Sequence, residues 1–139
     1  ILKHALGWGV GLRQLCDVAR LCYRRKEEVN GKEVEEVCRL AGITDWTSLL
    51  HSFLIDYMGM LEASLPFATK HISSEPLLYR ILRGGNFGQH RKDMDKAASG
   101  SLKRKIHTAC SFAQNAAFAL RYAPGEGART FWTLLRGQF

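Results

Sequence analysis

The polar residues best able to do chemistry lie together near the start of the chain. Arg13, Gln14 and Asp17 directly follow a glycine-rich stretch. Arg13 and Asp17 are four residues apart, so on a helix they share one face and can form an ion pair. In a functional interpretation, Asp17 orients the guanidinium while Arg13 offers its planar fork to a phosphate or carboxylate. In a structural interpretation, the same pair is a salt bridge on a packed helix.

The residues just before this cluster narrow what it could bind. Gly7, Gly9 and Gly11 contain a G-x-G, but no strand-like segment precedes it. A dinucleotide-binding fingerprint requires that strand, so we exclude it. The glycines instead permit a close approach of helices or a tight entry into the first helix. His4 could join the cluster as an acid, a base or a phosphate contact, or could be an ordinary surface or core histidine.

A second candidate binding segment lies in the middle of the chain. Residues 84–100 are rich in glycine and charge, which predicts an irregular loop. Asn86, Gly88 and His90 have the composition of a turn that binds an anion through its backbone. The alternative is a glycine-rich surface turn without a ligand. Nearby cations could attract phosphate, namely Arg80, Arg83, Arg91 and Lys92.

Histidine and cysteine spacing argues against a metal site. The five histidines form no HxH or HExxH pattern, and the four cysteines form no CxxC pair. Cys16, Cys22 and Cys38 fall on predicted apolar stripes, where a free cysteine behaves as a small hydrophobe. We therefore expect a reducing, cytoplasmic environment. No stretch approaches the roughly 20 apolar residues that span a bilayer.

The length and the net charge of the chain limit its number of domains and the kind of partner that it favours. With 139 residues, 46% of them hydrophobic, the chain can form one domain with a single core. Its net charge of +7 favours an anionic partner: a nucleotide, a nucleic acid, a phosphorylated substrate or an acidic membrane surface. A merely basic surface is the alternative.

The spacing of apolar residues predicts helices throughout, and no segment has the strict alternation of a half-buried strand. The expected helices cover residues 12–28, 32–41, 44–61, 74–84 and 101–122, followed by a last amphipathic helix beginning at Pro124. Thr44 is predicted as an N-cap, and Ser74 begins a compact helix-start signal. The predicted fold is all-α, a single compact bundle of about six helices.

The same spacing predicts which side chains face inward. The 44–61 helix has the longest apolar stripe and should be central: Trp46, Leu49, Leu50, Phe53, Leu54, Tyr57, Met58 and Leu61. The inward residues of the first helix are Leu12, Leu15, Cys16, Ala19, Cys22 and Tyr23. A second stripe on that helix consists of Arg13, Asp17, Arg20 and Arg24. Other residues predicted to face inward are Val34, Val37, Cys38, Ala41, Leu78, Ile81, Leu82 and Leu120.

The pattern HxxxxGxGLRQLCD, from His4 to Asp17, and the later GGNFG resemble a family of largely uncharacterised bacterial nucleotidyltransferases. These enzymes have a catalytic domain of the polymerase-beta-like type. The residues that carry the resemblance are His4, Gly9, Gly11, Leu12, Arg13, Gln14, Asp17, Gly85, Asn86, Phe87 and Gly88. Similarity covers residues 1 to about 90 and fades in the last third of the chain.

The resemblance implies that residues 1–139 are a helical C-terminal accessory domain. The catalytic domain, with paired acidic residues that bind magnesium, is then expected upstream, because Asp93 and Asp95 follow no strand. This chain alone would be inactive and hold no cofactor. The implied partners are that upstream domain, a nucleoside triphosphate and an unidentified acceptor. The implied pocket residues are His4, Arg13, Gln14, Asp17, Asn86, Gly88 and His90. The alternative is a non-enzymatic basic helical module that binds nucleic acid, which we favour less, or a protein partner.

Overall fold

The computed structural model describes residues 1–2, 5, 10–84 and 116–135. Its helices are α2 (Leu12–Arg24), α3 (Gly31–Leu40), α4 (Thr44–Met58), α5 (Glu75–Gly84), a segment over 116–122, and α8 (Pro124–Leu135). Short 3-10 turns, η1 (Lys26–Glu28) and η2 (Glu62–Ser64), follow α2 and α4. The predicted all-α fold of about six helices is confirmed. The predicted loop beyond residue 84 and helix 101–122 before residue 116 lie outside the described residues.

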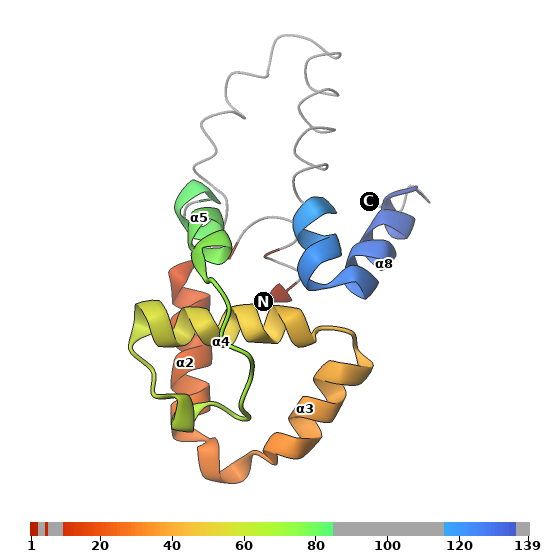
Figure 1. Ribbon diagram of the computed structural model, residues 1–139. Coiled ribbons are helices and arrows are strands. Elements are labelled where there is room, and N and C mark those ends of the chain that lie inside the picture. Colours follow the sequence, from red (N-terminus) through yellow and green to blue (C-terminus); the bar gives the residue numbers. More distant parts are fainter. Residues whose placement is uncertain (3–4, 6–9, 85–115, 136–139) are drawn as a thin grey trace.

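Helix α4 is central, as its apolar stripe predicts. It crosses α2, and both α3 and α5 contact it (Figure 1). Leu49 and Phe53 of α4 are fully buried together with Leu15 of α2 and Leu77 of α5. At the start of α4, the Trp46 ring meets the Phe118 ring edge-on, with 6.3 Å between centroids. One core therefore joins the early helices to the 116–122 segment.

Two predicted helix boundaries are wrong, the end of the first helix by about a turn and the N-cap of α4 by one residue. Helix α2 stops at Arg24, and residues Lys26–Glu28 form a 3-10 turn rather than a continuation. The N-cap of α4 is Ile43 rather than Thr44, and the Thr47 hydroxyl donates to the Ile43 carbonyl at 2.9 Å. The same carbonyl also accepts from the Thr47 backbone N–H at 2.9 Å, and Ile43 has no polar side chain to cap the N–H groups of the first turn.

Several apolar residues predicted to face inward are exposed instead. In α2, Leu15 is fully buried, but Leu12 is 52% and Tyr23 74% exposed. Cys16 is exposed as well. The other exposed members of the predicted stripes are Val37, Ala41, Tyr57, Leu61, Leu82 and Leu120. For α2 the reason is geometric: the helix contacts α4 through one side of its apolar stripe, so the other side remains in solvent.

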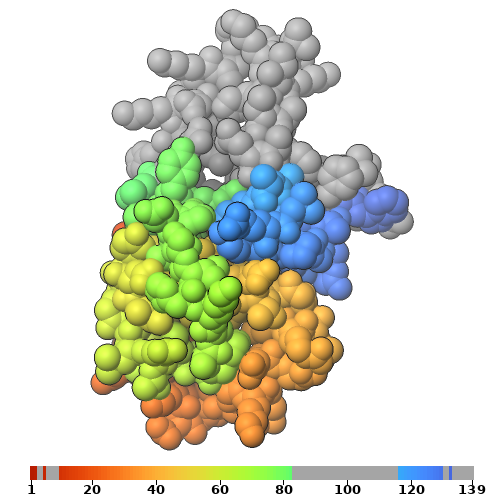
Figure 2. Space-filling view, in the orientation of Figure 1, coloured from red at the N-terminus to blue at the C-terminus, as the bar shows by residue number. Residues whose placement is uncertain are grey.

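The segment that follows α4 lies alongside it. Figure 2 shows this lime-green chain against the yellow helix on the face in view. In the middle of this segment, the backbone of Pro66 lies against Gly31, the first residue of α3. A Cβ atom at Gly31 would lie 2.1 Å from the Pro66 carbonyl oxygen, so this approach requires glycine.

Candidate functional site

Helix α2 carries a row of exposed arginines. Arg13, Arg20 and Arg24 are spaced by seven and four residues, which places them on one face of the helix, and all three are exposed. Within the described part of the chain, none of the three forms an ion pair. Their guanidinium groups are therefore available to an anion outside this set of residues.

Arg13 and Asp17 do not behave as a salt bridge. Both side chains are exposed, and no ion pair joins them in the structure. The predicted shared face follows from the helix, but the predicted contact is absent. Arg13 keeps its full set of donors, and Asp17 is a neighbouring carboxylate four residues further along the same face.

Gln14 has a structural partner. Its side-chain amide oxygen accepts a hydrogen bond from the Gly11 backbone N–H at 3.2 Å, and Gly11 is the N-cap of α2. This contact satisfies a backbone donor that the helix itself leaves unpaired and fixes the first turn. Gln14 therefore orients the turn that carries Arg13.

The remaining predicted site residues are not placed beside α2 by the structure. His4, Asn86, Gly88 and His90 lie outside the described residues. Arg80, one of the cations near the predicted loop, is half-buried. Its guanidinium donates to the Ala5 carbonyl at 2.8 Å and lies over the Phe118 ring, 4.0 Å from the centroid. Arg80 thus helps to hold the fold together.

Next to the arginine row, α2 exposes an apolar row of Leu12, Cys16 and Tyr23. Spacings of four and seven residues put these side chains along one line of the helix surface. We call the apolar row and the arginine row together the α2 face. It combines exposed apolar area with positive charge that has no ion-pair partner in the described part of the chain, a combination typical of surfaces that contact another molecule.

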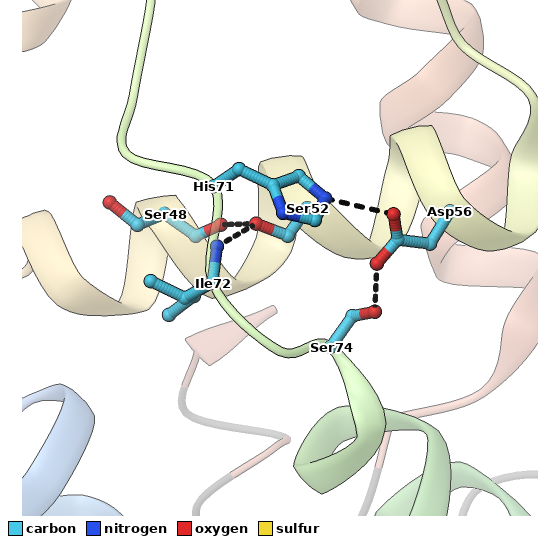
Figure 3. A network of polar contacts seen from close by, with 6 residues as sticks. All are labelled: Ser48, Ser52, Asp56, His71, Ile72 and Ser74. Atoms are coloured by element: carbon cyan, nitrogen blue, oxygen red, sulfur yellow. Dashed lines mark hydrogen bonds and ion pairs between the residues drawn. The ribbon is translucent and has the colours of Figure 1, made fainter.

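A polar network that the sequence did not predict joins α4 to the segment before α5 (Figure 3). His71 Nε2 lies 2.9 Å from Asp56 Oδ1, and the Ser74 hydroxyl donates to Asp56 Oδ2. The hydrogen bond from Ser74, and then that from His71, hold the pKa of Asp56 below its ordinary value. Both contacts cross more than a dozen residues of sequence, so helical spacing could not reveal them.

The same segment has a second attachment to α4. Ser52 is buried; its hydroxyl donates to the Ser48 carbonyl at 2.8 Å and accepts from the Ile72 backbone N–H at 3.0 Å (Figure 3). At the preceding residue, His51 Nδ1 lies 3.1 Å from Thr69 Oγ1. Burial lowers the pKa of His51 to about 4, so this imidazole is neutral near neutral pH.

The arrangement of this network is structural rather than nucleophilic. The Ser74 hydroxyl donates to the carboxylate of Asp56, whereas a catalytic serine would donate to an imidazole. The Ser74 carbonyl accepts from the Leu77 and Leu78 backbone N–H groups at 3.1 Å, which begins α5. Asp56 therefore fixes the start of α5 at the end of α4. The helix-start signal at Ser74 was visible in the sequence, but its partner was not.

A small pocket opens beside the network. It has a volume of about 260 Å³ and is lined by Ser52, Ile55, Glu62, Leu65, Thr69 and His71. The residues come from α4, from η2 and from the segment that follows η2. None of them is among the residues that the sequence patterns single out for binding.

The described ranges contain neither a candidate metal site nor a candidate membrane span. No group of three or more His, Cys, Asp or Glu side chains there could hold a metal ion. Likewise, no helix in those ranges is long and apolar enough to traverse a bilayer.

Comparison with known proteins identifies no relative of this chain. No family model matches the chain, and neither the curated proteins nor the solved structures contain a significant match.

Proposed function

We propose that this chain is the helical accessory domain of a nucleotidyltransferase. The whole protein would transfer a nucleoside monophosphate from a triphosphate to an acceptor, and the α2 face would border the nucleotide pocket. The observation that carries the proposal is the row of three exposed arginines without an ion-pair partner among the described residues. Guanidinium groups bind phosphate through paired, charge-assisted hydrogen bonds.

The spacing of the row suits a compact polyanion. At the rise of an α-helix, Arg20 and Arg24 are about 6 Å apart along the axis, and Arg13 lies about 10 Å further towards the start. Flexible arginine side chains on one face can converge on a triphosphate from these positions. They would position the phosphates and offset their charge, without taking part in bond chemistry.

The apolar row has a separate role in this proposal. Leu12, Cys16 and Tyr23 would pack against the upstream catalytic domain, which would remove their exposed apolar area from water. The magnesium-binding carboxylates would belong to that domain, where the metal ions stabilise the attacking and leaving oxygens. The accessory domain would supply only its arginine side chains and part of the border of the nucleotide pocket.

The direct test is an assay for nucleotidyl transfer by the complete natural polypeptide. Each of the four nucleoside triphosphates, labelled at the α-phosphate, is supplied with magnesium, and pyrophosphate release and label transfer are followed. We expect turnover by the complete polypeptide and none by residues 1–139 alone. A complete polypeptide that neither binds a triphosphate nor releases pyrophosphate would overturn the proposal.

The exposed apolar row also favours a second candidate function, a non-enzymatic module that binds a protein. An apolar row edged by arginines fits an amphipathic helix whose edge carries carboxylates. In that case residues 1–139 bind such a partner and show no nucleotide affinity. If nucleic acid were the partner instead, binding would weaken steeply with added salt as counterions are released.

A further inference from the structure

We propose that the pocket lined by Ser52, Ile55, Glu62, Leu65, Thr69 and His71 binds a small organic cation, a primary ammonium on a short apolar body. The pocket and the α2 face share no residue. The two proposals can therefore fail separately.

Two of the residues that line the pocket suit an apolar body. Ile55 is half-buried and Leu65 is buried, and both line the cavity. A volume of about 260 Å³ is below that of a typical drug-sized site, so the pocket fits a ligand of a few carbon atoms. Burial of those carbons would supply most of the affinity.

Three side chains of the pocket have acceptor capacity beyond the contacts they make. In the tautomer that donates from Nε2 to Asp56 Oδ1, 2.9 Å away, the His71 Nδ1 atom is a hydrogen-bond acceptor. The Glu62 carboxylate has no ion-pair partner among the described residues. Thr69 Oγ1 keeps acceptor capacity beyond its contact with His51. An ammonium group offers three donors and no acceptor, which complements this set.

The charge of the pocket selects the same class of ligand. None of its six lining residues is a lysine or arginine, although the chain as a whole carries a charge of +7. Lys70 stands between Thr69 and His71 in the sequence, but its side chain is exposed and does not line the cavity. With Asp56 behind His71, the pocket disfavours an anion.

The experiment is an NMR titration of the 139-residue protein with n-butylammonium. Butanol and butyrate, which have the same carbon chain, serve as the neutral and anionic comparisons. We expect saturable shifts of Thr69, His71 and the Ile55 methyl groups with the ammonium, at least about tenfold weaker binding of butanol, and no saturable response to butyrate.

Substitution of the exposed carboxylate gives the control. Glu62→Gln preserves shape and should weaken n-butylammonium binding about tenfold, because one charge-assisted hydrogen bond is lost. Glu35→Gln removes the same charge from an exposed position on α3 and should leave binding unchanged. The proposal is wrong if the ammonium gives no saturable shifts, if butanol binds equally well, or if Glu62→Gln binds like the unmodified protein.

Discussion

At the scale of single residues, His51 is the clearest case in which burial of a side chain makes the stability of the fold depend on pH. Its side chain is 4% exposed, is bonded to Thr69 and meets the Phe67 ring edge-on. Because burial disfavours the imidazolium, the pKa of His51 is lowered from 6.5 to about 4. Between these values the unfolded chain binds a proton that the folded chain does not.

The first prediction is that stability falls as the pH is lowered from 6.5 towards 4. A single proton gives a slope of at most about 1.4 kcal/mol per pH unit. Urea unfolding across this range measures the slope, and His51→Gln should flatten it. An NMR titration of His51 with a midpoint near its ordinary value would contradict the account.

The second prediction concerns Asp56, which accepts from both His71 and Ser74. Asp56→Asn should lower the free energy of unfolding by about 1 kcal/mol, because a charge-assisted contact at the start of α5 is lost. Asp17→Asn is the matched control, since Asp17 is exposed and has no ion pair with Arg13. Chemical denaturation gives both values, and a double variant with Ser74→Ala should be less destabilised than the sum. Strict additivity would mean that the Asp56–Ser74 contact carries no energy.

Single residues also show the limit of inference from sequence. The spacing placed Arg13 and Asp17 on one helix face, but it could not show that they form no ion pair. Gln14 looked like a binding residue because its partner, the Gly11 backbone, has no side chain to complete a recognisable capping pattern. Asp56, His71 and Ser74 meet only through tertiary folding, so their spacing carried no signal.

At the scale of elements, periodicity predicted the helices better than their orientation. Helix α4 is buried along its stripe from Trp46 to Leu54 because neighbours contact it on several sides. Helices α2 and α3 lie at the edge, so Leu15 and Cys38 are buried while Tyr23 and Val37 are exposed. An apolar stripe indicates which side can be buried, but only the neighbouring elements decide how much of it is covered.

The third prediction tests the contact between α3 and the segment after η2. Gly31→Ala should destabilise the protein by about 1–3 kcal/mol, because the new Cβ would lie 2.1 Å from the Pro66 carbonyl oxygen and backbone must move. Gly125→Ala in α8 meets nothing closer than 3.9 Å. It should be neutral or stabilising by up to about 1 kcal/mol. Thermal unfolding compares the two, and equal melting temperatures would refute the close approach.

At the scale of the whole molecule, the α2 face is an exposed surface whose arginines have no ion-pair partner among the described residues. The fourth prediction is that Tyr23→Ser changes the unfolding free energy of the 139-residue protein by less than about 0.5 kcal/mol, since the ring is 74% exposed. In the complete polypeptide the same substitution should lower the melting temperature, because the apolar row would lose its contact with the catalytic domain. If the Tyr23→Ser and unmodified complete polypeptides have equal melting temperatures, the proposed contact between the apolar row and the catalytic domain is wrong.

The fifth prediction concerns Arg13 and tests the central claim, that the arginine row serves phosphate rather than packing. The measurement is the nucleotidyl transfer rate of the complete polypeptide together with its melting temperature. Arg13→Ala should lower the rate about 100-fold or more at an unchanged melting temperature, because a positioned cation is lost. Lys32→Ala, which removes an exposed cation from α3, should retain the rate. An Arg13→Ala protein with a full transfer rate, or one destabilised by about 2 kcal/mol, would contradict the claim.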